Sequence, residues 1–186
     1  MCRSSLVLPL FLICAATPAL AGVIVVGSGI GRECYEQTLL ARPLMRSFRA
    51  LEICDKAVNE YEVSAHDRAA AFVNRADILL KMQKYLEAVA DSEKAITLDP
   101  RIGAAHLNRG AGMIGLERYN DALVSLNQAM DLGGDNLQLI YFDRGMAKEN
   151  LGDVKGAYYD YRKAAELDPS FQLAIQQLSR FAVTTR

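Results

Sequence analysis

The residues of this chain that could carry chemistry are few, and their spacing matches no catalytic pattern. The 186 residues include only two histidines, His66 and His106, and neither has a cysteine or a second metal-ligand side chain at the spacing of a zinc site. Residues 27–31 read GSGIG, which is not the G-x-G-x-x-G spacing of a dinucleotide-binding loop. No G-x-S-x-G motif and no phosphate-binding loop occurs. We therefore expect no enzyme activity, no metal ion, no cofactor and no small-molecule substrate.

The charge balance argues against nucleic acid as a partner. The chain has 21 Lys and Arg residues against 22 Asp and Glu residues, which gives a formal net charge of −1 at pH 7. Nucleic-acid-binding domains need a cluster or stripe of basic residues, and no such run occurs here. The expected partner is therefore another protein.

Residues 1–21 have the features of a secretory signal peptide. Arg3 is their only charge, and the apolar run 6–16 is shorter than the roughly 20 residues that a membrane span needs. The sequence Ala19-Leu20-Ala21 predicts cleavage after Ala21. This predicts a periplasmic or secreted protein with a flexible leader at 22–32. An uncleaved anchor, which would place the protein at a membrane, is the alternative because the apolar region continues through 22–26.

One pattern recurs three times in the remainder of the chain. The segments 84–100, 118–134 and 153–169 each contain an alanine, a second alanine seven residues later, and a leucine three residues after that. These residues are Ala88, Ala95 and Leu98; Ala122, Ala129 and Leu132; and Ala157, Ala164 and Leu167. A fixed period of this length is typical of stacked helical repeats. The Asp-Pro pairs at 99–100 and 168–169 should end helices, because the residue before a proline is disfavoured in the helical region.

These residues make the chain resemble tetratricopeptide repeat proteins, with units at 69–102, 103–136 and 138–171. The family pattern has a small residue in the middle of the first helix, here Ala76, Gly110 and Gly145, and an alanine twelve residues later. The resemblance implies an all-α, right-handed α-solenoid built from helix pairs.

The segments on either side of the repeats are expected to cover the ends of the array. Residues 33–68 are interpreted as a degenerate leading helix pair, and residues 170–183 as a C-terminal capping helix that begins at Ser170. Cys34 and Cys54 are twenty residues apart, which is the spacing of facing core positions in the repeats. In an exported protein this predicts a disulfide; the alternative is two buried free thiols.

In this family the first helices of successive units line a concave groove, so the resemblance also implies a partner-binding site. The corresponding residues are Val73, Asn74 and Asp77 in the first unit, Leu107 and Asn108 in the second, and Phe142, Asp143 and Met146 in the third. Their side chains suit an extended peptide or a helix with apolar side chains. Some family members bind a C-terminal carboxylate through lysine and arginine. We expect no such clamp, because its positions are neutral or acidic and only Asn108 is retained.

Arg75, Arg109 and Arg144 recur at one position of the repeat. They could form an anion-binding ladder, but we favour pairing of each arginine with an acidic residue of a neighbouring helix. The predicted function is that of a non-catalytic protein–protein interaction module of the cell envelope, which binds a segment of another envelope protein in its groove. The alternative is a structural or self-associating subunit of an envelope assembly that uses its outer faces.

Overall fold

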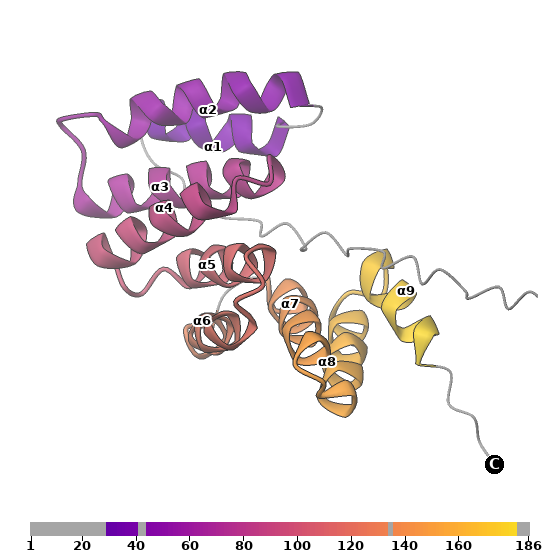
Figure 1. The fold of residues 1–186 in the computed structure, drawn as a ribbon. Coiled ribbons are helices and arrows are strands. Elements are labelled where there is room, and N and C mark those ends of the chain that lie inside the picture. Colours follow the sequence, from indigo (N-terminus) through magenta and orange to yellow (C-terminus); the bar gives the residue numbers. More distant parts are fainter. Residues whose placement is uncertain (1–28, 41–43, 134–135, 182–186) are drawn as a thin grey trace, which may run out of the picture.

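The structure is a computed structural model that describes residues 29–40, 44–133 and 136–181. Within these ranges it contains helices and no strands, which confirms the prediction of an all-α solenoid. The helices are α1 (Ile30–Leu40), α2 (Leu44–Val58), α3 (Ala65–Lys81), α4 (Tyr85–Leu98), α5 (Gly103–Gly115), α6 (Tyr119–Asp131), α7 (Leu137–Asn150), α8 (Val154–Leu167) and α9 (Gln172–Arg180). The described helices pack as four successive pairs, α1–α2 to α7–α8, and each pair stacks on the next (Figure 1). Helix α9 packs against α8 at the end of the array.

The turns within and between the pairs repeat as the sequence does. The second helices α4 and α8 end at Leu98 and Leu167, and each following aspartate has an extended backbone, with φ −146° at Asp99. Inside each of the pairs α3–α4, α5–α6 and α7–α8, one residue of the turn has a positive φ: 60° at Gln83, 60° at Glu117 and 86° at Gly152. A left-handed residue after a helix is a common way to satisfy its last carbonyl groups.

Small residues allow the two helices of a pair to approach closely. Ala76 and Ala88 are both fully buried where α3 crosses α4. A Cβ added to Gly110 would lie 2.7 Å from Leu126 Cγ, and one added to Gly145 would lie 2.8 Å from Tyr161 Cε1. The glycines of the second and third units are thus required by the larger side chains opposite them.

Two helix boundaries differ from the positions that the sequence predicts. Helix α3 begins four residues before the expected unit boundary at 69, because the Ser64 Oγ accepts a hydrogen bond from the Asp67 backbone N–H at 3.0 Å. The capping helix α9 begins at Gln172 instead of Ser170, whose hydroxyl donates to Asp168 Oδ1 at 2.7 Å. Side-chain hydrogen bonds of this kind compete with helical ones, so sequence patterns place helix ends poorly.

Candidate functional site

The predicted groove residues lie on the first helices of three consecutive pairs. Helix α3 carries Val73, Asn74 and Asp77; α5 carries Leu107 and Asn108; and α7 carries Phe142, Asp143 and Met146. Helix α5 contacts both α3 and α7, so the structure does bring the three sets together. All eight side chains are buried, with at most 4% of their surface exposed. The sequence pattern predicted an accessible groove floor and missed this burial.

Two asparagines, one repeat apart, have unused hydrogen-bonding groups in this region. The Asn108 Nδ2 donates to the Val73 carbonyl at 3.1 Å and joins α5 to α3, but no described residue donates to its Oδ1. Neither Nδ2 nor Oδ1 of Asn74 has a hydrogen bond to any described residue. Both side chains are at most 1% exposed. A buried polar group without a partner costs about 1–3 kcal/mol, so a ligand that supplied hydrogen bonds here would recover that free energy.

The charged residues of this region are mostly acidic. Asp77 forms an ion pair with Lys81 on the same helix, with 2.8 Å between the Lys81 Nζ and the Asp77 Oδ2, and Lys81 also donates to the Thr38 carbonyl. Asp143 lies on α7, two helix pairs further along the array, and is fully buried. An acidic peptide would therefore approach carboxylates here, and Coulomb repulsion at low dielectric is strong.

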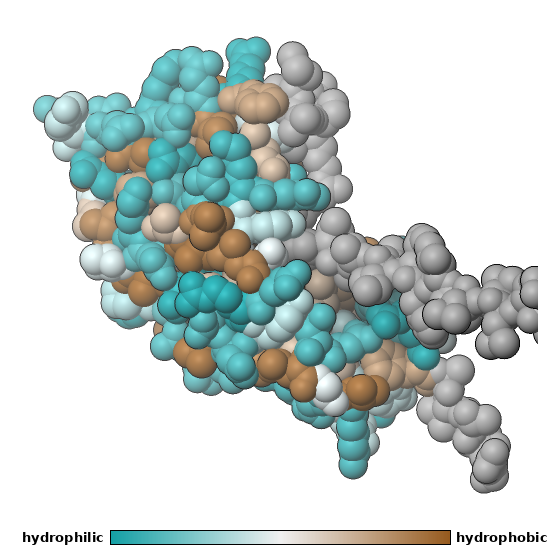
Figure 2. Space-filling model, viewed as in Figure 1, coloured by the Kyte–Doolittle hydropathy of each residue, from teal (hydrophilic) through white to brown (hydrophobic). Residues whose placement is uncertain are grey.

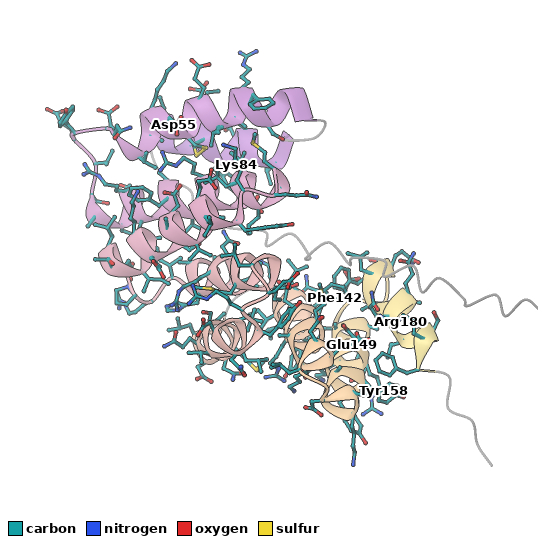
Figure 3. The ribbon with its side chains drawn as sticks, viewed as in Figure 1. Asp55, Lys84, Phe142, Glu149, Tyr158 and Arg180 are labelled. Carbon is teal, nitrogen blue, oxygen red and sulfur yellow. A yellow bond between two sulfur atoms is a disulfide. The ribbon has the colours of Figure 1, made fainter. Side chains whose placement is uncertain are left out.

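Phe142 is held by an aromatic cluster at the C-terminal end of the array. Its ring centroid lies 5.5 Å from that of Tyr161 on α8 and 5.2 Å from that of Phe171, just before α9. The Tyr161 hydroxyl donates to Glu149, which also accepts from Arg180 at 2.8 Å (Figure 3). Burial and the hydrogen bond to Glu149 raise the pKa of Tyr161, so its hydroxyl remains a donor. Phe142 is thus a core residue as well as a candidate groove residue.

The three repeated arginines bridge neighbouring helices. Arg75 makes a bidentate ion pair with Asp91 of α4, at 2.6 and 2.8 Å, and Arg144 makes the same pair with Asp160 of α8, at 2.8 and 2.7 Å. These contacts confirm the prediction of pairing with acidic residues of neighbouring helices. Arg109 makes no such bidentate pair.

Cys34 of α1 and Cys54 of α2 are fully buried and are joined by a disulfide in the structure, with their Cα atoms 4.7 Å apart. The twenty-residue spacing therefore does correspond to facing positions of a helix pair. Whether the bond forms in the cell depends on the compartment, so a disulfide in the native protein remains a prediction.

The part of the chain that the structure describes includes neither a metal-binding cluster nor a membrane-spanning helix. No group of three or more His, Cys, Asp or Glu side chains there could hold a metal ion. None of the described helices is both long enough and apolar enough to cross a membrane.

The family comparison identifies the repeats. The sequence profile described as "Tetratricopeptide repeat" matches residues 69–102 and 139–171, the expected first and third units. The chain contains tetratricopeptide repeats. The second unit lies between the two matched segments. After Leu132 it has Gly133-Gly134 where the other units have Asp-Pro.

Known proteins similar to this tetratricopeptide chain support the same fold. Hsc70-interacting protein 1 of Drosophila melanogaster is 34% identical over 113 residues, which are 61% of this chain but only 29% of that protein. The TPR domain of Arabidopsis OM64 superposes with a TM-score of 0.60 at 24% identity and covers 64% of this chain and 98% of that domain. The second TPR domain of human RPAP3, in complex with the HSP70 peptide SGPTIEEVD, has a TM-score of 0.57 at 25% identity and covers 63% of this chain and 97% of that domain.

The comparisons correct the predicted localisation. Similar curated proteins come from fruit fly, rice, wheat and Dictyostelium, which are eukaryotes without a periplasm, and several are named for Hsc70, Hsp70 or Hsp90. The prediction of a periplasmic or secreted protein is therefore wrong, and these relatives give no support to a partner in the cell envelope. It was based on the short apolar run and the cleavage pattern of residues 1–21, which lie outside the described residues. An apolar run is a local property that does not by itself specify a compartment.

Proposed function

We propose that this tetratricopeptide array is a non-catalytic protein-binding module that holds an extended segment of a partner protein along α3, α5 and α7. The proposal is supported by related domains, one of which is solved with a bound HSP70 peptide. The observation that carries it is the pair of buried asparagines, Asn74 and Asn108, with hydrogen-bonding atoms that no described residue satisfies. The backbone of an extended peptide offers donors and acceptors at regular intervals, which could satisfy amides on successive helices.

The chemistry of the same helices favours a neutral or basic apolar segment. Val73, Leu107, Phe142 and Met146 supply apolar side chains, and Asp77 and Asp143 are the acidic side chains beside them. Lys81 is already paired with Asp77, so an acidic peptide such as SGPTIEEVD should bind poorly. Because the side chains are buried in the structure, a partner can reach them only after the residues that cover them move. We therefore expect association slower than the 10⁵–10⁷ M⁻¹s⁻¹ that is typical of preformed sites.

The test uses a displayed library of ten-residue peptides and the variant Asn74→Ala. This substitution removes no hydrogen bond within the described part of the protein, so the fold should be retained. The matched control is Asn120→Ala, at an exposed position on α6. The selected peptides should be apolar and either neutral or basic. Asn74→Ala should lower the affinity for them at least fivefold, and Asn120→Ala should leave it unchanged. Equal binding by Asn74→Ala, or selection of acidic peptides, would show that the partner does not lie along these helices.

Self-association through the second helices of the pairs, α4, α6 and α8, is a second candidate function. Large apolar side chains are exposed there, including Leu86 at 70%, Val124 at 58% and Tyr159 at 47%. Figure 2 shows apolar residues in separate patches among hydrophilic ones on the face in view. Sedimentation velocity distinguishes the two functions, because a self-associating subunit would increase in mass between about 1 and 100 μM, whereas a groove-binding monomer would not.

A further inference from the structure

A pocket of about 620 Å³ lies beside the second repeat, and none of the predicted groove residues lines it. It lies between α4 and α6 and is lined by Glu93, Ile96, Thr97, Pro100, His106, Arg109, Gln128, Asp131 and Leu132. Its volume is within the range of small-ligand pockets, roughly 300–1,000 Å³. No function considered above uses it.

Comparison of the three repeats shows why a pocket lies here. The position of His106 is occupied by Phe72 in the first unit and by Tyr141 in the third. In those units the repeated arginine covers the aromatic ring, with Arg75 Cζ 5.4 Å from the Phe72 centroid and Arg144 Cζ 5.0 Å from the Tyr141 centroid.

A second departure occurs at the partner of the arginine. Sixteen residues after the arginine, the first and third units have Asp91 and Asp160, whereas the second unit has Ser125. The Arg109 Nη1 donates to the Ser125 Oγ at 3.2 Å and its Nε donates to Glu93 at 3.3 Å, both longer than the bidentate contacts of the other units. The Arg109 Nη2 makes no hydrogen bond to a described residue. The Nη2 groups of Arg75 and Arg144 donate to Asp91 and Asp160. The Nη2 of Arg109 therefore lacks the partner that its counterparts have.

His106 adds a second unused group beside Arg109. Its ring is 5% exposed, and its Nε2 lies 3.0 Å from the Pro100 carbonyl. A carbonyl oxygen only accepts, so Nε2 carries a hydrogen and Nδ1 is the remaining ring nitrogen. Nδ1 is buried and has no hydrogen-bond partner among the described residues. In this tautomer Nδ1 can only accept a hydrogen bond, so the donor that the pocket offers to an anion is Arg109.

We propose that this pocket binds a single carboxylate attached to an apolar group. The carboxylate would occupy the place that Asp91 and Asp160 occupy in the other units and accept from the Arg109 Nη2. The apolar part of the ligand would pack on Ile96 and Leu132.

Glu93 and Asp131 limit which anions can enter. Both carboxylates line the pocket, and Glu93 already contacts the Nε of Arg109. Both repel any anion, but they repel a phosphate, which carries more than one negative charge near neutral pH, more strongly than a single carboxylate, which replaces the charge that Ser125 lacks. The ligand could be a small organic acid or the side chain of an aspartate or glutamate in a partner protein, and these two sources share the same recognition chemistry.

Ser125→Asp is the decisive variant because it copies the first and third repeats. The new carboxylate should pair with Arg109 within the chain and close the site without disturbing the fold. Ser125→Asn has nearly the same size but no charge, and should leave the site open. Circular dichroism and thermal unfolding of both variants would establish that any loss of binding is not a loss of structure.

Binding would be followed by NMR on the ¹⁵N-labelled full chain, through the Arg109 Nε–Hε group and the His106 ring nitrogens. Sodium hexanoate is the small-acid probe, with hexanamide and inorganic phosphate as controls. Acetyl-Leu-Glu-Leu-amide and its glutamine counterpart represent a partner side chain.

Hexanoate or the glutamate peptide should shift the Arg109 and His106 signals in a saturable way, and the controls should not. Ser125→Asp should weaken binding at least tenfold, and Ser125→Asn less than threefold. Tighter binding of the glutamate peptide would identify a partner protein as the source, and tighter binding of hexanoate a small acid. The proposal is overturned if hexanamide binds as well as hexanoate, if Ser125→Asp binds as the wild type does, or if neither carboxylate shifts these signals at 10 mM.

Discussion

Gly110→Ala tests whether close helix approach explains the small residues of the repeat. The added Cβ would lie 2.7 Å from Leu126 Cγ and 2.8 Å from its Cδ2. Carbon atoms in contact are normally about 3.5–4.0 Å apart, so the overlap approaches 1 Å. Leu126 is fully buried and branches at Cγ, so it has little room to move. In the first repeat an alanine is tolerated because Ser92 occupies the position of Leu126.

Two opposing effects set the magnitude. Overpacking of a buried site typically costs about 1–3 kcal/mol. Replacing glycine by alanine in a helix gains about 0.5–1 kcal/mol. We therefore expect Gly110→Ala to reduce the free energy of unfolding by about 1–2 kcal/mol. Gly31→Ala in α1 is the control, because a Cβ there meets no atom within 4 Å and should be neutral or slightly stabilising.

Urea unfolding followed by circular dichroism would measure both variants and the double variant Gly110→Ala/Leu126→Ala. Leu126→Ala alone should cost about 2–5 kcal/mol. In the Gly110→Ala background it should cost about 1–2 kcal/mol less, because removing the leucine relieves the overlap and the new methyl group fills part of the cavity. The explanation fails if Gly110→Ala is as stable as the wild type, or if the two changes are additive within about 0.5 kcal/mol.

Two further predictions concern pH and redox state. The hydrogen bond with His66, together with the Arg101 backbone N–H, lowers the pKa of the Asp99 carboxyl from 3.8, so its stabilising effect is present above that value and is lost as the pH falls through the folded pKa. His66→Ala should raise this pKa toward 3.8 in a ¹³C NMR titration, and an unchanged value would contradict the assignment. Reduction of the Cys34–Cys54 disulfide should lower the free energy of unfolding by about 3 kcal/mol in the chain-entropy account, measured in urea unfolding, and a Cys34→Ser/Cys54→Ser variant should not respond to reductant.

Much of the fold could be predicted from sequence because the repeat is a local code. The recurring Ala, Gly and Leu-Asp-Pro positions each describe contacts within one helix pair, and a pattern seen three times averages out local exceptions. The pairing of Arg75 with Asp91 follows the same logic, since a fixed separation within a pair brings two side chains together. Localisation could not be predicted in this way, because an apolar run in residues 1–21 has no necessary connection to the array.

The sequence by itself determined that the chain forms stacked helix pairs with tetratricopeptide spacing, because close helix crossing needs small residues at fixed intervals. Only the tertiary structure decided that the groove residues are buried, since exposure depends on what packs over a helix and not on its own pattern. The pocket beside the second repeat also depends on the tertiary structure. His106 and Ser125 are nineteen residues apart and unremarkable in sequence, but the stacking of α4, α5 and α6 places Arg109 and His106 in one pocket, with Ser125 hydrogen-bonded to Arg109.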